Sequence, residues 1–566
     1  MLNFLNKLQV IIFYLFFFLY PVIFANITFE PTEHAKLLFL IVTTIILVTL
    51  NSFKLIIAKK IEFGSTRFLI PLFIIALIYI LTSIFVSPNQ VLPWVTTLST
   101  STWVFILMFY ILLSSQKNAV NSGLLDLTVF GSAFSALYVI LMYAGIIPQG
   151  VTTPIGNVLA TSIFFLILII YLALSFSIAF ADKKYSLRNA LKKNILRILS
   201  FALIVFAQTF LIFHIVTDQK PILLPNNIGF SIFQEVADDP KNIFLGVGPT
   251  NFITAFTLGK PASINQTALW NITFTSSSSL FTNLLTETGI ISGLAYFSLI
   301  LISLYQFIIN IAKSNWLQSV PLVCLIFLGT LLLFFPGSMS LMILFSCLMG
   351  ITDIRTNFHE IKLHKLKYIL FLLSAAAISF ACIVLYLGLK SYLAEYHYFA
   401  AFEALQQKNL SLAYNLQKEA INNNPLIDKY HLGISQTSLF IADEFLKKEE
   451  KTEAETRQIP SLISQSIEEG RRAVNLNKTN IINWANLTKI YSSLITYAPG
   501  AEKWAVEIGL QTIALDPNNP KPYVSLSNIY RTLGQNAKSD ELLDKARNLK
   551  PDLPYEGRVL EKSIIE

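Results

Sequence analysis

Residues 158–181 read VLATSIFFLILIIYLALSFSIAFA, a stretch without a single charged side chain. A helix needs roughly 20 consecutive apolar residues to cross the hydrocarbon core of a bilayer, so this stretch predicts a transmembrane helix. Similar apolar runs recur from the N-terminus to about residue 390. Together they predict about eleven spans, near residues 8–25, 37–57, 68–86, 96–114, 124–146, 158–181, 196–216, 282–309, 317–335, 338–352 and 367–389.

Composition supports a membrane protein with two parts. The chain has 566 residues, of which 54% are hydrophobic and 13% are charged. A soluble chain carries roughly 25% charged residues. The deficit is confined to residues 1–390, so we predict a transmembrane domain there and a soluble helical domain over 391–566, with a boundary near Lys390. The first span is not followed by a small-x-small cleavage site, which favours a retained helix over a signal peptide.

The basic residues predict an orientation. With the N-terminus in the cytoplasm, the inner links hold 17 Lys and Arg residues and the outer links before residue 390 hold four, namely Lys36, Lys220, Lys241 and Lys260. This bias follows the positive-inside rule. It places the link over residues 217–281 and the C-terminal domain outside the cytoplasm. The net charge of +8 therefore reflects topology and does not indicate nucleic-acid binding.

The spans themselves indicate few chemical sites. They contain almost no buried charge, which disfavours an ion pump or a proton-driven transporter. Cys324, Cys347 and Cys382 all fall in predicted spans, where free cysteine is a small packing residue. The sequence therefore predicts no metal, no cofactor and no disulfide framework.

The C-terminal domain carries a repeated pattern of helix pairs. The last copy, from Pro520 to Asp552, is marked by Tyr523, Leu526, Ser527, Tyr530, Gly534, Ala537 and Ala546. Earlier copies are marked by Trp484, Leu487, Tyr491, Ala505 and Asp516, and more weakly by Ala413, Ala420 and Asn424. The spacing resembles tetratricopeptide repeats, whose unit is about 34 residues. We predict an α-solenoid that binds a protein partner, or alternatively one that caps the membrane part, with residues 447–460 as an exposed linker or helix end.

The link over residues 217–281 contains two motifs. It includes NIFLGVGPTNF at residues 242–252 and leads into SSSSLFTNLLTETG at residues 276–289. A third stretch, TPIGNVLA at residues 153–160, opens the sixth span. In order and spacing these resemble the O-antigen ligase and O-antigen polymerase superfamily, with its Gly-x-Gly-x-x-x-Phe turn at the entry of a large external loop and its Glu-x-Gly at the exit. The resemblance covers roughly residues 120–350.

The resemblance implies an all-α membrane glycosyltransferase. Such enzymes move a glycan from undecaprenyl pyrophosphate to an envelope glycan, lipid or protein acceptor. The alternative is a non-catalytic envelope scaffold that binds lipid-linked glycan or protein partners through its repeats. The leaving pyrophosphate needs cationic or N–H donors, and the acceptor hydroxyl needs a base.

Site residues follow from this resemblance. Glu287 matches the family's Glu-x-Gly, and Ser278 stands where the family has a loop histidine. Glu287 at the start of a helix has a capping role as its alternative. The loop has no arginine, so the cations available for the pyrophosphate are Lys220, Lys241 and Lys260. The turn residues Gly246, Gly248 and Asn251 complete the predicted substrate-binding set.

Two further residues are candidates from their positions. His214 lies near the outer end of the seventh span, where an ionisable group is a functional candidate; its alternative is an interfacial histidine bonded to a helix carbonyl. Trp270 either stacks on a sugar ring or anchors the loop at the membrane interface.

Overall fold

The computed structural model describes residues 1–58, 60–63, 66–116, 123–148, 152–181, 194–217, 221–314, 316–353, 359–362 and 367–553. Apart from one strand pair, the regular elements in these residues are helices, which confirms the predicted all-α class. In that pair, β1 (Lys60–Phe63) runs antiparallel to β2 (His359–Lys362). The chain divides into two compact units, the first comprising Met1–Asn226, Pro240–Thr250 and Ser277–Pro425, and the second Asn227–Asp239, Asn251–Ser276 and Leu426–Glu566.

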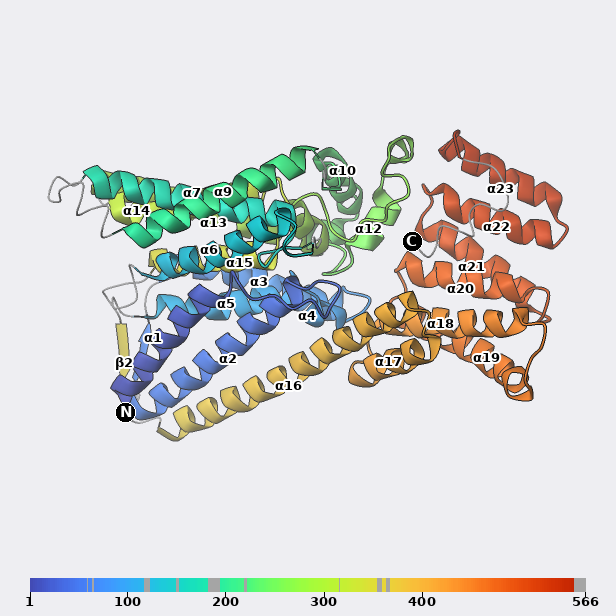
Figure 1. Cartoon of the computed structure of the whole chain (residues 1–566), viewed down its shortest axis with the longest axis horizontal. Helices are drawn as coiled ribbons and strands as arrows, with labels where there is room; N and C mark the ends of the chain where they lie inside the picture. The colour runs from blue at the N-terminus through green and yellow to red at the C-terminus, as the bar shows by residue number, and fades with distance from the viewer. Residues whose placement is uncertain are drawn as a thin grey trace. The chain divides into compact units, whose positions relative to one another are not determined.

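The first unit is a bundle of apolar helices (Figure 1). Its helices are α1 (Leu2–Leu19), α2 (Glu33–Ala58), α3 (Leu69–Phe85), α4 (Leu92–Val95), α5 (Thr100–Ser114), α6 (Leu124–Tyr143), α7 (Val158–Ala181), α9 (Ile195–Thr217), α11 (Pro240–Leu245), α13 (Leu280–Ala312), α14 (Trp316–Leu331), α15 (Met339–Asp353), α16 (Lys367–Gln406) and α17 (Leu410–Asn423). Each predicted span overlaps one of them, and the first, 8–25, extends past the end of α1. Among the described helices, seven are long and apolar enough to cross a membrane, and four shorter ones are also apolar. The exact number of spans stays a prediction.

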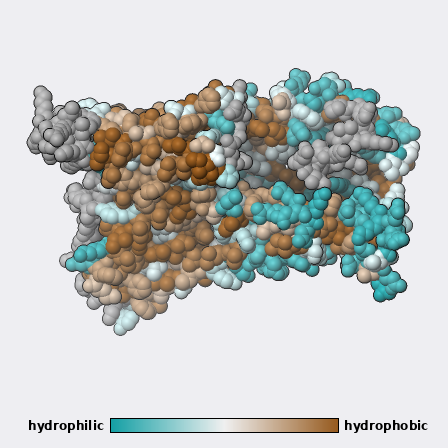
Figure 2. Space-filling view, viewed as in Figure 1, coloured by the Kyte–Doolittle hydropathy of each residue, from teal (hydrophilic) through white to brown (hydrophobic). Residues whose placement is uncertain are grey.

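Side chains of this bundle pack as interlocking aromatic rings and present an apolar surface. Phe16 stacks on Phe39 at 5.2 Å between ring centroids and lies 4.5 Å from Phe109. Figure 2 shows hydrophobic residues covering the visible surface of these helices, whereas hydrophilic residues are frequent over the repeats. An apolar exterior around an apolar core is the pattern of helices that face lipid.

The expectation that the spans are almost free of buried charge is wrong at Asp126 and Glu287, which are buried within predicted spans, and Lys36 and Asp353 are buried just outside them. Lys36 in α2, Asp126 in α6 and Asp353 in α15 are each less than 10% exposed. Asp126 forms an ion pair with Arg197, and Asp353 accepts a hydrogen bond of 2.5 Å from the hydroxyl of Tyr110. A buried charge is tolerated when it is paired and hydrogen-bonded, which composition alone does not reveal.

The second unit combines the C-terminal repeats with part of the long loop. Its elements are α10 (Asn226–Ala237, all but its first residue), α12 (Phe252–Gly259), the 3₁₀ helix η2 (Ala262–Gln266), α18 (Asp428–Lys447), α19 (Glu453–Leu476), α20 (Ile481–Leu494), α21 (Ala501–Leu515), α22 (Pro520–Thr532) and α23 (Asn536–Leu549). The last two hairpins are those predicted from the sequence, and Gly534 turns the final one with φ 73°. The hairpin of α18 and α19 lacks the sequence markers and was not predicted.

The domain limits differ from those predicted. The boundary near Lys390 falls inside α16, because the helix continues to Gln406 and packs against α17. The division instead lies between Pro425 and Leu426. Residues 251–276, assigned from the sequence to the membrane domain, belong with the repeats.

Small residues set the packing of the repeats. Ala505 and Ala546 are fully buried, and a Cβ on Gly509 would lie 2.9 Å from Cδ1 of Leu526. Ala537 is exposed, so its predicted role in close packing is wrong. It lies in the first turn of α23, away from the stripe that contains Ala546.

This difference within one helix gives a matched test. We expect Ala546→Leu to destabilise the protein by about 1–3 kcal/mol, because the added atoms have no space in the core. Ala537→Leu, the same change at an exposed position, should alter stability by less than about 0.5 kcal/mol. The thermal unfolding midpoints of the purified full-length variants measure both. Equal shifts would contradict the packing described for α23.

Candidate functional site

A glycine turn in the loop and the first part of α13 are joined through their main chains. The backbone N–H of Val247 donates to the carbonyl oxygen of Thr286 at 3.0 Å. The backbone N–H of Gly248 donates to the carbonyl oxygen of Glu287 at 2.9 Å. Gly246 and Gly248 both have positive φ, as a tight turn requires. We call this contact the glycine interlock. It brings together three of the predicted site residues, Gly246, Gly248 and Glu287.

The interlock needs glycine on both sides because the two chains approach closely. Gly246 has φ 63°, and a Cβ there would lie 2.3 Å from the carbonyl carbon of Glu287. Gly289 has φ 78° and ψ −179°, which interrupts α13. A Cβ on Gly289 would lie 2.2 Å from the carbonyl oxygen of Phe244. The Gly-x-Gly and Glu-x-Gly motifs therefore meet as a steric fit of backbone against backbone.

Hydroxyl groups cap the start of α13. Ser279 and Thr282 form a reciprocal capping box, in which the N–H of Thr282 donates to Oγ of Ser279 at 3.1 Å. Ser278 is buried, and its Oγ lies 3.3 Å from Oγ1 of Thr282. The contact of Ser278 is that of a residue supporting the helix start. Glu287 lies further along α13 and is buried, so it is not the first-turn capping residue that its alternative proposed.

A polar cluster at the start of α2 was missed by the sequence prediction. Oε2 of Glu33 accepts a hydrogen bond of 2.6 Å from the backbone N–H of Met339, at the start of α15. Oε1 has no hydrogen-bond partner among the described residues, and a Cβ on Gly156 would lie 3.6 Å from it. Next to Glu33, Oγ1 of Thr32 donates to the carbonyl oxygen of Thr153 at 3.1 Å. The stretch at residues 153–160 thus lies beside a carboxylate with one unengaged oxygen.

Lys36 lies one turn further along α2. Its ammonium group is fully buried, donates to the carbonyl oxygen of Tyr20 and interacts electrostatically with Glu33. The prediction that Lys36 belongs to an outer link is wrong, because the helix begins before the apolar run does. The sequence feature that could have indicated this is the pair Glu33 and Lys36 immediately before the apolar run. A spacing of three residues places both side chains on one helix face.

Other predicted residues of the first unit are placed individually. His214 is half-buried in α9, with its ring centroid 4.8 Å from that of Tyr143 in an edge-on arrangement. Lys241 is exposed in α11. Lys220 lies outside the described residues. The roles assigned to these three residues stay predictions.

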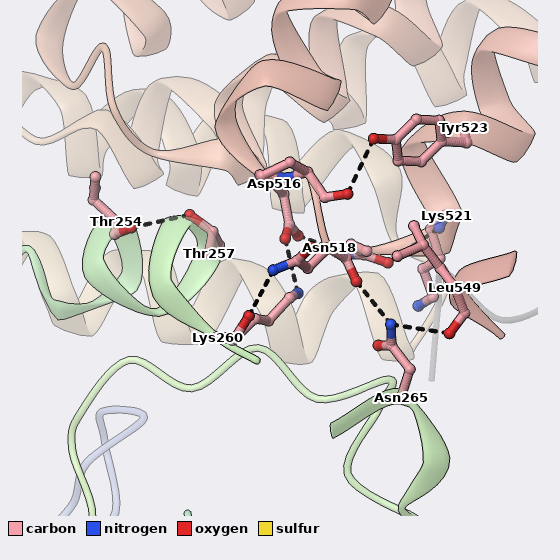
Figure 3. Close-up of polar contacts among 11 residues, drawn as sticks. Thr254, Thr257, Lys260, Asn265, Asp516, Asn518, Lys521, Tyr523 and Leu549 are labelled. Carbon is pink, nitrogen blue, oxygen red and sulfur yellow. Dashed lines mark hydrogen bonds and ion pairs between the residues drawn. The ribbon is translucent and has the colours of Figure 1, made fainter. Parts of the chain in front are cut away.

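Residues 251–276 of the loop lie against the repeats, and we call them the docked segment (Figure 3). Its helix α12 packs beside α20 and α21. Nζ of Lys260 lies 2.8 Å from Oδ1 of Asp516, and both side chains are at least 96% buried. The side chain of Asn518 donates to the carbonyl oxygen of Lys260 at 2.8 Å. The cation predicted to contact phosphate is therefore engaged by a carboxylate, and its burial leaves it unavailable to a lipid-linked donor.

Hydrogen bonds on either side of this ion pair extend the contact. Oγ1 of Thr479 donates to Oδ1 of Asn251 at 3.1 Å, and Oγ1 of Thr254 donates to the carbonyl oxygen of Thr479 at 3.2 Å. Further along, the side chain of Asn265 donates to the carbonyl oxygen of Asn518 at 2.8 Å. Asn251, predicted to bind substrate, is buried in this contact.

Trp270 lies near the end of the docked segment between two lysines. The ammonium groups of Lys550 and Lys521 lie 4.9 Å and 5.6 Å from the centroid of its ring. Lys550 also donates to the carbonyl oxygen of Asn265 at 3.0 Å. Cation–π contacts of this kind anchor an indole ring to a basic surface. In this structure Trp270 is thus an anchor of the loop on the repeats.

The repeat residues in this contact occupy equivalent positions. Asn477, Asp516 and Lys550 are the residues that end α19, α21 and α23, with φ of −143°, −144° and −150°. All three are buried. We call the turns that they begin, Asn477–Asn480, Asp516–Asn519 and Lys550–Asp552, the repeat edge. The repeat geometry therefore offers a series of similar turns at regular intervals.

Burial shifts the ionisation of charged groups at the repeat edge. It raises the pKa of the Asp516 carboxyl above its usual range, and the ammonium group of Lys260 opposes this rise. Burial lowers the pKa of Lys521, and repulsion by Lys260 lowers it further, whereas Asp516 raises it. Burial thus disfavours the charged form of the Asp516 carboxyl, and the nearby ammonium group of Lys260 favours it.

Comparison with known proteins gives little beyond the repeat fold. No protein-family model and no curated protein sequence matches the chain. Among solved structures, the chain is similar to MamA at 15% identity with a TM-score of 0.23, over 28% of this chain and 78% of that chain. It is also similar to a thermophilic TPR protein in Thermus thermophilus at 17% identity with a TM-score of 0.24, over 32% and 88%. At such TM-scores the likeness adds nothing to what the helix pairs show.

The glycine interlock gives a direct test. Gly289→Ala should destabilise the protein by about 2–5 kcal/mol, because alanine is strained at this φ and ψ and its Cβ collides with the chain at Phe244. The matched control is Gly145→Ala. Gly145 has φ 74°, but no atom of the described residues lies within 4 Å of an added Cβ, so only the backbone strain of about 1–2 kcal/mol remains. Thermal unfolding in detergent measures both, and equal losses would rule out the steric fit.

Proposed function

We propose that the chain is a membrane-embedded glycosyltransferase of the O-antigen ligase kind. It moves a glycan from undecaprenyl pyrophosphate to an envelope acceptor, in a bacterial inner membrane, with its N-terminus in the cytoplasm and the loop and repeats outside. The apolar helices of the first unit support a membrane location, since seven of the described helices are long and apolar enough to cross a bilayer.

The glycine interlock is the observation that carries this proposal. The Gly-x-Gly turn and the Glu-x-Gly segment are two of the three motifs that carry the resemblance, and they are joined by backbone hydrogen bonds of 2.9 and 3.0 Å. A transferase acting on a lipid-linked donor needs its external loop fixed against the helices, because the donor reaches the site from the membrane. A direct backbone connection between the loop and α13 supplies that constraint.

Glu33 is the residue best placed to act as the base. In the proposed step the acceptor hydroxyl attacks the anomeric carbon, the bond from that carbon to the pyrophosphate oxygen breaks, and the hydroxyl proton passes to a carboxylate. Glu33 has one oxygen fixed by the N–H of Met339 and one without a partner among the described residues. Ser278 is engaged in a helix cap, and a hydroxyl is not a base at neutral pH.

The scaffold alternative has a specific observation in its favour. Lys260 is buried against Asp516 and Ser278 supports the start of α13, so two of the residues that resemblance assigns to the reaction are engaged in structural contacts. A chain that kept the fold of the loop but lacked the groups needed for glycan transfer would bind lipid-linked glycan and not transfer it. A combined transfer and binding assay separates the two proposals.

The transferase is tested with lipid-linked oligosaccharide and protein reconstituted in liposomes. Glu33→Gln should reduce glycan release by about 100-fold or more, because glutamine keeps the hydrogen bond from Met339 but cannot accept the proton. The matched control is Glu30→Gln, the same change three residues earlier at a side chain that is 51% exposed, which should retain release to within about threefold.

The other outcomes of this assay distinguish a different base, a nonspecific charge effect and the scaffold alternative. Unchanged release by Glu33→Gln, together with loss by His214→Ala, would move the base to His214. Equal losses by Glu33→Gln and Glu30→Gln would indicate a nonspecific effect of negative charge. No release by the wild type, with measurable binding of the lipid-linked glycan, would favour the scaffold.

A further inference from the structure

The docked segment meets the repeat edge in the order of its own sequence. Its early residue Thr254 bonds the turn at Thr479, Lys260 pairs with Asp516 in the next turn, and Asn265 bonds Asn518 and, at 3.4 Å, the carbonyl oxygen of Leu549 that precedes the last turn. Trp270 then lies against Lys550. One continuous segment therefore engages three successive turns.

Most of these contacts use main-chain acceptors and do not depend on the repeat sequence, whereas one ion pair does. The carbonyl oxygens of Thr479, Asn518 and Leu549 accept hydrogen bonds from the segment, and main-chain acceptors are present in any repeat. The ion pair of Lys260 with Asp516 is different, because a lysine fits only where a turn offers a carboxylate. Asn477 and Lys550 occupy the equivalent positions of the neighbouring repeats, and neither carries a negative charge. The last turn does hold Asp552, but that side chain is 79% exposed and paired with Lys550, so Asp516 is the buried carboxylate that fixes which turn Lys260 faces.

Chain connectivity links this contact to the glycine interlock. The docked segment begins directly after Thr250, in the turn that follows Gly248, and ends directly before Ser277, at the cap of α13. Any slippage of the segment along the repeat edge would pull on both motifs. Segments that are held at both ends and along their length have few accessible conformations.

We propose that the repeat edge is the binding site for the chain's own loop, and that Lys260 and Asp516 are positioning residues that hold this loop in one register. The inference rests on the proposed transferase for its functional part, because the loop positions the donor-side motifs in that reaction. The occupant of this face of the repeats is a segment of the same chain. An external protein partner would have to use another face.

The test measures loop protection and transfer in the same full-length protein. Lys260→Met removes the positive charge and leaves Asp516 buried without it, and we expect hydrogen exchange over residues 251–276 to accelerate by about 100-fold. Adding Asp516→Asn to Lys260→Met should restore part of the protection, since no unpaired charge remains. Asn265→Ala, which changes no repeat residue, should accelerate exchange by about tenfold.

A surface variant provides the control for the repeats. Asp544 is 69% exposed and pairs only with Arg547 on the same helix among the contacts described, so Asp544→Asn should change neither exchange nor transfer. In Lys260→Met and Asn265→Ala, exchange within α20 and α22 should stay at the wild-type rate, which separates a released loop from an unfolded domain. In the liposome assay the same two variants should lower kcat with KM for the lipid-linked donor unchanged.

Three results would overturn all or part of the inference in distinguishable ways. Unchanged exchange of residues 251–276 in both loop variants would show that the repeat edge does not hold the loop, whatever the activity. Faster exchange with unchanged kcat would remove the positioning role. A wild type that transfers no glycan would refute the proposed function together with that role, while the exchange rates would still decide whether the loop is bound.

Discussion

Two backbone hydrogen bonds, from Val247 to Thr286 and from Gly248 to Glu287, constrain the region on which the remaining arguments depend. They join main-chain atoms, so neither bond depends on the chemistry of the side chains at Val247 and Thr286. The glycines are not free, because a Cβ on Gly246 or Gly289 would enter the facing chain. The long loop therefore leaves and re-enters the first unit at fixed points, and a loop with fixed ends can be held along its length by a modest number of contacts.

The second constraint is that charge inside an apolar bundle needs an internal partner. Lys36 is bonded to the carbonyl oxygen of Tyr20, Asp126 to Arg197, and Asp353 to Tyr110. Asp126 also accepts a hydrogen bond from the hydroxyl of Tyr171, and Asp353 accepts one from the backbone N–H of Arg67, so these charges are satisfied within the bundle. Glu33 differs, because only one of its oxygens is bonded among the described residues. The other oxygen is the atom to which the proposed transfer reaction assigns the proton of the acceptor hydroxyl.

The sequence predicted the helices well because the signal is local. A run of about 20 apolar residues between charged links has few alternatives to a helix. The turn glycines were predictable for the same reason, as Gly246 and Gly248 lie two residues apart. Their partner was not predictable, because carbonyl oxygens at Thr286 and Glu287 leave no trace in the side chains. Glu33 stayed hidden since it precedes the apolar run and resembles a charge in a link.

Lys260 illustrates the limit of charge patterns most clearly. In a loop without arginine, the sequence suggests that an isolated lysine is available to bind a phosphate. Its actual partner, Asp516, lies far along the chain in a repeat turn, and both charges are buried. Their interaction is intramolecular, so it acts at an effective concentration in the millimolar range for a flexible tether, and higher when the segment is held at both ends. A protein competing for the same turns must exceed that concentration. The repeats are therefore better suited to hold this loop than to recruit a partner through the same face.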